Sequence, residues 1–208
     1  MEKNNKKIKA VLFDLDGVLV DMPDGHFEAL NKALSLFGAN IAKDEHFNFF
    51  NGLPTRKKIE ELEKQKRIPA GLKEVVNSIK QKYTKELIPK YCPPDYSKII
   101  LLKHLKAKGI KVACCSNSVK ETLHLMLQAS GLFPFFDLII GNDEITNPKP
   151  HPEIYIEAMK RLGVNNKECI IIEDSPHGIK SAKDSGAHVI EVRGVADVNL
   201  SLFEKIFE

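Results

Sequence analysis

Five short apolar runs, separated by longer amphipathic stretches, constrain the fold of this 208-residue chain more than any other feature. The runs are rich in Val and Ile, as strands buried on both faces of a sheet should be. They are IKAVLF (8–13), IKVACCS (110–116), FFDLIIG (135–141), ECIIIED (168–174) and HVIEVRG (188–194).

Helical patterns lie between the later runs, and their ends are marked by caps. SVKETLHLMLQASG, HPEIYIEAMKRLG and SPHGIKSAKDSG all end in glycine, and the last begins with Ser175 as a candidate N-cap, followed by Pro176. Strands that alternate with helices of this length predict an α/β fold with a doubly wound, Rossmann-like parallel sheet.

The interval from residue 21 to 92 interrupts this alternation. It holds three helical patterns, HFEALNKALSLFG, TRKKIEELEKQKR and LKEVVNSIKQKYTKELI, and no convincing strand. Turn-forming stretches, DMPDG (21–25) and YCPPDY (91–96), bound it. We therefore expect an α-helical cap domain at 21–92, inserted into an α/β core domain that comprises 1–20 and 93–208.

The composition excludes several functional classes. The net charge of +3, from 31 basic and 28 acidic residues, is too even to indicate nucleic-acid binding. The first apolar run, Ala10–Phe13, is too short for a signal peptide, and no stretch approaches the ~20 apolar residues that cross a bilayer. The four cysteines lack metal-site spacing and suit a reducing compartment. We expect a cytoplasmic monomer with neither a membrane nor a nucleic-acid partner.

Polar side chains follow four of the predicted strands at their carboxyl ends, where open parallel sheets bind ligands. Singly, each could be a cap, a turn residue or a surface group. Together, the carboxylates would repel one another, and their hard oxygen ligands predict a divalent cation, Mg²⁺. The residues are Asp14, Asp16 and Gly17, then Ser116 and Asn117, then Lys149, and finally Glu173, Asp174 and Ser175.

These residue types suit the transfer of a phosphoryl group. Its anionic oxygens need cations and hydrogen-bond donors, which Lys149, Ser116 and the N–H groups of the following helix could supply. Asp14 could attack phosphorus and form an aspartyl-phosphate. Asp16 could protonate the leaving oxygen and afterwards deprotonate water.

Four segments, FDLDGVLVD, CSNS, NPKPHPEIY and IIEDSPHGIKSAKDSGA, resemble in order the four motifs of the haloacid dehalogenase-like (HAD) hydrolase superfamily. The nearest resemblance is to its β-phosphoglucomutase-like phosphatase subgroup, which has a helical cap after the first motif. True haloacid dehalogenases usually lack the second aspartate of the first motif, so Asp16 argues against cleavage of a carbon–halogen bond.

The resemblance also implies roles for individual residues. Asp14 would be the nucleophile and Asp16 the general acid and base. Mg²⁺ would be held by the Asp14 carboxylate, the Asp16 backbone carbonyl and Asp174, with Glu173 close to the metal or behind its ligands. The residues that would bind the transferring phosphoryl group are Ser116, Asn117 and Lys149.

Two cap residues are candidates for contact with the substrate. NGLPTRKKIEEL (51–62) resembles the specificity loop of the subgroup, in which Arg56 would meet a distal anionic group of the substrate. His26 resembles a histidine near the cap hinge of the mutase. Both residues also have a simpler interpretation: Arg56 could be a solvent-exposed arginine at a helix start, and His26 a structural histidine.

Three functions stay open at this stage. We favour a Mg²⁺-dependent phosphatase that acts on a small phosphorylated metabolite, a sugar or polyol phosphate. A β-phosphoglucomutase-type phosphomutase is the close alternative, because its chemistry differs only in returning the phosphoryl group to a sugar. A receiver-like phospho-accepting signalling domain is less favoured, since a slow switch does not need the acid and base that Asp16 supplies.

Overall fold

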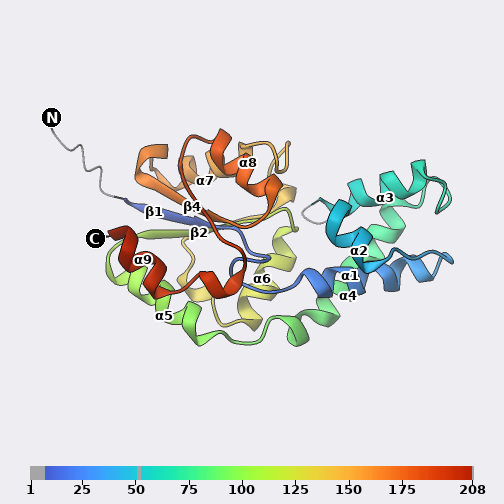
Figure 1. The fold of residues 1–208 in the computed structure, drawn as a ribbon, viewed down its shortest axis with the longest axis horizontal. Helices are drawn as coiled ribbons and strands as arrows, with labels where there is room; N and C mark the ends of the chain where they lie inside the picture. Colours follow the sequence, from blue (N-terminus) through green and yellow to red (C-terminus); the bar gives the residue numbers. More distant parts are fainter. Residues whose placement is uncertain (1–7, 51–52, 208) are drawn as a thin grey trace.

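The computed structural model describes residues 8–50 and 53–207; the tail 1–7, Asn51 and Gly52 of the predicted specificity loop, and Glu208 lie outside the described residues. Five strands form one parallel sheet in the order β3-β2-β1-β4-β5 (Figure 1). They are β1 (Ala10–Phe13), β2 (Lys111–Cys115), β3 (Leu138–Ile140), β4 (Cys169–Glu173) and β5 (His188–Glu191). The predicted doubly wound α/β fold is confirmed.

The register of the central strands brings three chain segments to one edge of the sheet. Phe13 of β1 pairs with Cys114 of β2 on one side and with Ile172 of β4 on the other. The residues that follow these positions therefore emerge together at the carboxyl edge. Backbone hydrogen bonds continue just past the strands, since Asp14 N–H donates to the Ile172 carbonyl at 3.1 Å.

Helices cover both faces of the sheet (Figure 1). One face packs against α5 (Tyr96–Ala107), α6 (Lys120–Ala129) and α9 (Leu200–Phe207), and the other against α7 (Glu153–Leu162) and α8 (Pro176–Asp184). Because side chains alternate along a strand, the adjacent Cys114 and Cys115 belong to opposite cores. In the described part of the chain, four short 3₁₀ helices lie in the connections: η2 (Phe133–Phe135), η3 (Asn142–Glu144), η4 (Asn166–Glu168) and η5 (Val195–Asp197).

In the described residues of the predicted insert, 21–50 and 53–92, the regular secondary structure is helical, with turns and loops between the helices. It contains α1 (Pro23–Ser35), α2 (Lys43–Glu45), the π-helix η1 (His46–Phe50), α3 (Thr55–Lys64) and α4 (Lys73–Tyr91). These helices lie beside the sheet, at the right of Figure 1, around an apolar cluster of their own. The exact domain boundaries at 20/21 and 92/93 stay a prediction.

The stretch DMPDG (21–25) corrects one detail, because it is not a separate turn. Pro23 is the first residue of α1, so most of the stretch belongs to the helix. Proline suits this position because its fixed φ matches the helix and its missing N–H is not needed in the first turn.

None of the helices in the two described ranges, 8–50 and 53–207, combines the length and the apolar character needed to cross a membrane. The four cysteines are free thiols, and all of them are buried.

Candidate active site

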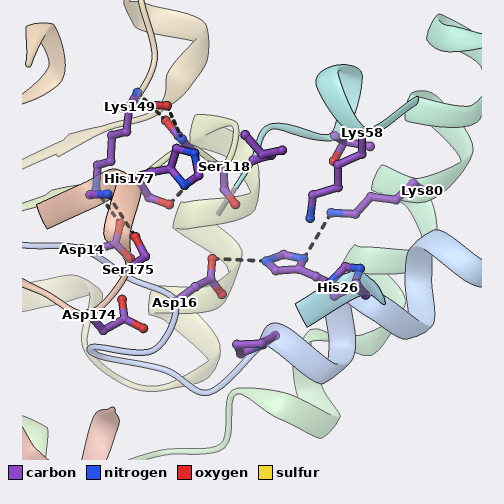
Figure 2. A pocket seen from close by; sticks show the side chains of 17 residues that line it. Asp14, Asp16, His26, Lys58, Lys80, Ser118, Lys149, Asp174, Ser175 and His177 are labelled. Carbon is purple, nitrogen blue, oxygen red and sulfur yellow. Dashed lines mark hydrogen bonds and ion pairs between the residues drawn. The ribbon is translucent and has the colours of Figure 1, made fainter. Parts of the chain in front are cut away.

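A cavity of about 100 Å³ lies between the carboxyl edge of the sheet and the helices of the insert (Figure 2). The sheet side and the helical insert contribute chemically different walls. The sheet side carries Asp14, Asp16, Ser116, Asn117, Ser118, Lys149, Asp174, Ser175, His177 and Gly178. The insert carries Pro23, His26, His46, Leu53, Thr55, Lys58 and Lys80.

On the sheet side of the cavity, Lys149 forms contacts with four other residues. Its Nζ donates to Asp14 Oδ1 at 2.7 Å, to Glu173 Oε1 at 2.6 Å and to the Cys115 carbonyl at 2.8 Å. The hydroxyl of Tyr155 lies 2.8 Å from the same Nζ and donates to Glu173 Oε1 at 2.7 Å. Burial acts to lower the pKa of Lys149, but the two carboxylates outweigh it and raise the pKa, so the side chain is a permanent cation.

Asn117 fixes the loop that carries this lysine. Its Nδ2 donates to the Lys149 carbonyl at 3.2 Å, and its Oδ1 accepts from the Lys149 N–H at 3.0 Å. Ser116, directly after β2, is buried, and its Oγ accepts from the Ser118 N–H at 3.2 Å. The structure thus brings Ser116, Asn117 and Lys149 together at the cavity, where Asn117 holds the Lys149 backbone; their contact with a phosphoryl group stays a prediction.

The carboxylates form a site that fits a hard divalent cation. One oxygen each of Asp14, Glu173 and Asp174 lies within 4.8 Å of the others. Oδ1 of Asp16 and Oδ1 of Asp174 are buried without a hydrogen-bond partner among the described residues, and buried carboxylate oxygens need one. Burial, reinforced by the charge of Glu173, raises the pKa of Asp174 to about 6. Burial likewise raises the pKa of Asp14.

Gly17 keeps the first loop close to this cluster. Its φ is +85°, and a Cβ at this position would lie 2.1 Å from Asp174 Oδ2. A side chain there would displace Asp174, and the backbone conformation itself favours glycine. The loop can therefore bring the backbone beside Asp174 only because residue 17 has no side chain.

Glu173 is fully occupied by protein donors. Besides Lys149 and Tyr155 on Oε1, its Oε2 accepts from the N–H groups of Asp174 at 3.0 Å and Ser175 at 3.3 Å. Helix α8 packs directly against it, since a Cβ on Gly178 would lie 1.8 Å from Glu173 Oε1. Glu173 is near enough to belong to the acidic cluster. Because both of its oxygens already accept hydrogen bonds from the protein, Glu173 is better suited to orienting Lys149 than to binding a cation.

His26 links the sheet side to the insert. Its Nε2 lies 3.2 Å from Asp16 Oδ2, and Lys80 Nζ lies 3.2 Å from its Nδ1 (Figure 2). Burial, and then the charge of Lys80, lower the pKa of His26, so we assign a neutral ring. Because Lys80 donates to Nδ1, the single ring proton is placed on Nε2, where it donates to Asp16.

Arg56 is not brought to the cavity. Its side chain is 58% exposed and forms an ion pair with Glu74, with Nη2 and Oε2 2.9 Å apart. Lys58, two positions later, faces inward instead, because two helical residues differ by roughly 200° around the axis. Within the predicted specificity loop, the structure therefore places Lys58 rather than Arg56 at the cavity, and a contact of Arg56 with the substrate stays a prediction.

Lys58 and Lys80 are among the cavity residues that sequence reasoning missed. Each is only 7% exposed. A signal exists in the helical spacing: Lys80 continues the buried stripe of Val76, Thr84 and Leu87 in α4. Lysines on helices are normally exposed to solvent, so the position of Lys80 inside an apolar stripe indicates an unusual, buried lysine.

Comparisons with known proteins agree with this geometry. The family model described as haloacid dehalogenase-like hydrolase matches residues 11–192. A probable phosphatase, IndB, of Dickeya dadantii is 30% identical over 88% of this chain and 80% of its own length. The phosphorylated carbohydrates phosphatase of Thermotoga maritima is 30% identical over 86% of this chain and 82% of its own.

A solved structure extends the likeness to the whole fold. The β-phosphoglucomutase of Clostridium difficile superposes with a TM-score of 0.81 and 25% identity, over 96% of this chain and 97% of that one. The family match covers all the residues that line the cavity, from Asp14 to Gly178. The chain therefore belongs to the haloacid dehalogenase-like hydrolase superfamily, and within it to the β-phosphoglucomutase-like subgroup.

Proposed function

We propose that this enzyme is a Mg²⁺-dependent phosphatase that hydrolyses a small sugar or polyol phosphate through an aspartyl-phosphate on Asp14. As a member of its family it is a phosphoric monoester hydrolase, and a phosphorylated small molecule is its substrate. The observation that carries the finer proposal is the placement of Asp14, which faces the cavity while Lys149 holds one of its oxygens at 2.7 Å.

The first chemical step follows from this contact. Lys149 holds Oδ1 of Asp14, which leaves Oδ2 to attack phosphorus. The bond from phosphorus to the ester oxygen breaks as the bond to Asp14 forms, and Asp16 gives its proton to the departing oxygen. The N–H of His26, 3.2 Å from Asp16 Oδ2, orients that carboxyl group toward the cavity.

The second step regenerates the enzyme. Asp16, now ionised, takes a proton from water as the water oxygen attacks the phosphorus of the aspartyl-phosphate. Asp14 then leaves as a carboxylate beside Lys149, whose charge stabilises it. Ser116 and Lys149 would contact the oxygens of the phosphoryl group, and Asn117 holds their loops together.

Mg²⁺ would be held by Asp14, the Asp16 carbonyl and Asp174, and would supply positive charge to the phosphoryl oxygens. The fit rests on the buried, unpartnered Oδ1 of Asp174 and on the acidic cluster that Asp174 forms with Asp14 and Glu173. Oxygen ligands of this charge suit Mg²⁺ better than softer metals.

The proposed function is tested by a screen of phosphorylated metabolites with Mg²⁺, read as released inorganic phosphate. We expect release from sugar or polyol phosphates and none when Mg²⁺ is chelated. A stable aspartyl-phosphate with no turnover of any compound would instead favour the phospho-accepting signalling domain. Membership of a hydrolase family argues against that outcome.

A phosphomutase is the second candidate. Two observations favour it: the likeness to a β-phosphoglucomutase over 96% of the chain, and the position of His26 beside Asp16. Incubation with β-glucose 1-phosphate separates the two activities. Glucose 6-phosphate as the product would show a mutase, whereas inorganic phosphate alone would show the proposed phosphatase.

Mg²⁺ is expected to raise the melting temperature more at about pH 7.5 than at about pH 5, because binding requires ionised carboxylates. The pKa of Asp174 without metal, about 6, exceeds its ordinary value of 3.8. The Asp174 carboxyl group therefore stabilises the folded protein at low pH, and this stabilisation is lost as the pH rises through about 6. Above that pH, bound Mg²⁺ can restore the lost stability. Differential scanning fluorimetry measures the shift, and Asp174→Asn should remove it. An equal shift at both pH values would contradict the assignment.

The remaining expectations concern the setting of the enzyme. Four buried free thiols support a reducing compartment, and we propose the cytoplasm. The monomeric state and the absence of a nucleic-acid or membrane partner stay predictions.

A further inference from the structure

Tyr155 joins the buried ion pairs of Lys149 without lining the cavity itself. It is the third residue of α7 and lies completely buried in the core between this helix and the sheet. Its hydroxyl donates to Glu173 Oε1 at 2.7 Å and lies 2.8 Å from Lys149 Nζ. Burial, and then the charge of Glu173, raise the pKa of Tyr155, so the hydroxyl keeps its proton and stays a donor.

The ammonium group of Lys149 has more oxygen neighbours than hydrogens. A lysine ammonium has three N–H donors. Four oxygens of the described residues lie within 2.8 Å of Nζ, namely Asp14 Oδ1, Glu173 Oε1, the Cys115 carbonyl and the Tyr155 hydroxyl. Two of these neighbours must therefore share one N–H. Glu173 and Tyr155 can share it, because the hydroxyl gives a hydrogen of its own to Glu173.

The two carboxylate oxygens that hold the ammonium group differ in their other donors. Asp14 Oδ1 accepts from Lys149 alone among the described residues. Glu173 Oε1 accepts from Lys149 and also from Tyr155. A buried carboxylate oxygen without any donor is costly. Lys149 can thus turn one N–H away from Glu173 and leave this oxygen with a partner.

The cavity is where such an N–H would be used. Lys149 lines the cavity, and Figure 2 shows its ammonium group beside Asp14. In the proposed mechanism, Lys149 contacts an oxygen of the phosphoryl group that Asp14 attacks. An ammonium group with all its hydrogens bound to protein acceptors would first have to break one of those bonds.

We propose that Tyr155 is a positioning residue for phosphoryl transfer: by donating to Glu173, its hydroxyl makes one N–H of Lys149 available to an oxygen of the phosphoryl group. This inference rests on the proposed phosphatase function, and Tyr155 acts through Glu173 and Lys149 without touching the substrate. Phenylalanine at position 155 would leave three protein acceptors for three N–H groups. That saturated arrangement would hold Lys149 back from the phosphoryl group.

Tyr155→Phe and Tyr91→Phe form a matched pair of variants, since each removes one hydroxyl that donates to a glutamate. Tyr91, at the end of α4, donates to Glu28 Oε2 at 2.9 Å and does not line the cavity. We expect Tyr155→Phe to weaken the binding of inorganic phosphate, with Mg²⁺ present, by about 10-fold or more, as the loss of a hydrogen bond to a charged group allows. Tyr91→Phe should leave the affinity unchanged. Isothermal titration calorimetry measures both.

The same variants separate positioning from a purely structural role. In the free protein, Tyr155→Phe leaves Glu173 Oε1 with Lys149 as its donor. We therefore expect its melting temperature to stay within about 3 °C of wild type. Its kcat/KM should fall by about 10-fold for every substrate alike, because the phosphoryl group is common to all of them. A structural role predicts a lower melting temperature with unchanged affinity for phosphate.

A crystal structure of the wild type with Mg²⁺ and inorganic phosphate tests the contacts without relying on a variant. We expect Lys149 Nζ within about 3.2 Å of a phosphate oxygen, with the Tyr155 hydroxyl still at hydrogen-bond distance from Glu173 Oε1. A bound phosphate without a contact to Lys149, or a Tyr155 hydroxyl that has left Glu173, would overturn the proposal.

The outcomes separate this inference from the proposed function. Unchanged phosphate affinity and turnover in Tyr155→Phe, or equal losses in Tyr91→Phe, would overturn the role of Tyr155 and leave the phosphatase standing. If no phosphorylated compound were turned over, the phosphatase proposal would fail. The affinities for inorganic phosphate would then decide the role of Tyr155, and a wild-type protein that binds no phosphate would overturn it as well.

Discussion

Asp14→Asn is expected to lower the rate of phosphate release by at least about 10³-fold and to leave the fold intact. The amide oxygen of asparagine is a far weaker nucleophile than a carboxylate, so the aspartyl-phosphate cannot form at a useful rate. The fold should persist because Lys149 keeps Glu173 as a counter-ion at 2.6 Å. Steady-state phosphate release and thermal unfolding followed by circular dichroism measure the two effects.

Asp16→Asn is the companion variant, because it removes the acid and base but keeps the nucleophile. We expect turnover to fall by about 10²- to 10⁴-fold, the usual contribution of positioned proton transfer. Acid quenching during turnover should still trap a phosphoryl group on this variant and on the wild type, but not on Asp14→Asn. A trapped phosphoryl group on Asp14→Asn, or its near-normal turnover, would remove Asp14 from the role of nucleophile.

Lys149→Met is expected to lower the free energy of unfolding by about 3–5 kcal/mol near neutral pH, as loss of one partner of a buried ion pair typically does. The substitution leaves the buried carboxylates of Asp14 and Glu173 without their cation. It should also abolish phosphatase activity, since the oriented oxygen of Asp14 is lost. Urea unfolding followed by circular dichroism gives the stability change. Lys120→Met, which removes a partly exposed ion pair with Glu144, should cost no more than about 1 kcal/mol.

The pH dependence of this variant follows from the two pKa shifts. The pKa of Lys149 is raised, so its stabilising contribution is complete from about pH 5 to 9 and is lost only in strong base. Lys149 acts to lower the pKa of Asp14, so its removal raises that pKa further, and protonation at low pH then relieves the buried charge. The stability difference from wild type should narrow as the pH falls. A difference that is constant or grows toward low pH would contradict the ion-pair explanation.

The sheet could be predicted from sequence because its strands are buried on both faces. Such strands appear as continuous apolar runs, and β4, CIIIE at Cys169–Glu173, has no exposed residue to interrupt it. Strand ends were predicted less accurately: the run 135–141 contains a strand of only three residues, Leu138–Ile140. Phe135, the first residue of that run, is instead the last residue of the 3₁₀ helix Phe133–Phe135, and the apolar pattern does not distinguish this turn from a strand.

The sheet side of the site was predictable for a related reason. Asp14 and Ser116 directly follow strands and Glu173 is the last residue of β4, and parallel strands bring their carboxyl ends to the same edge. On the insert, the approach of two helices depends on their rotation and packing, which sequence spacing describes poorly. Arg56 and Lys58 lie two residues apart, and only the packing of α3 showed which of them is buried.

The two walls of the cavity have a practical consequence for the design of variants. The groups proposed to make and break bonds are those of Asp14 and Asp16, with Ser116, Lys149 and Asp174 beside them on the sheet side, while the insert contributes residues 23, 26, 46, 53, 55, 58 and 80. A mutant library confined to positions 46, 53, 55 and 58 would alter which molecules are accepted without touching the reacting carboxylates. His26 and Lys80 should be kept constant in such a library, since their contacts connect the exchangeable wall to Asp16.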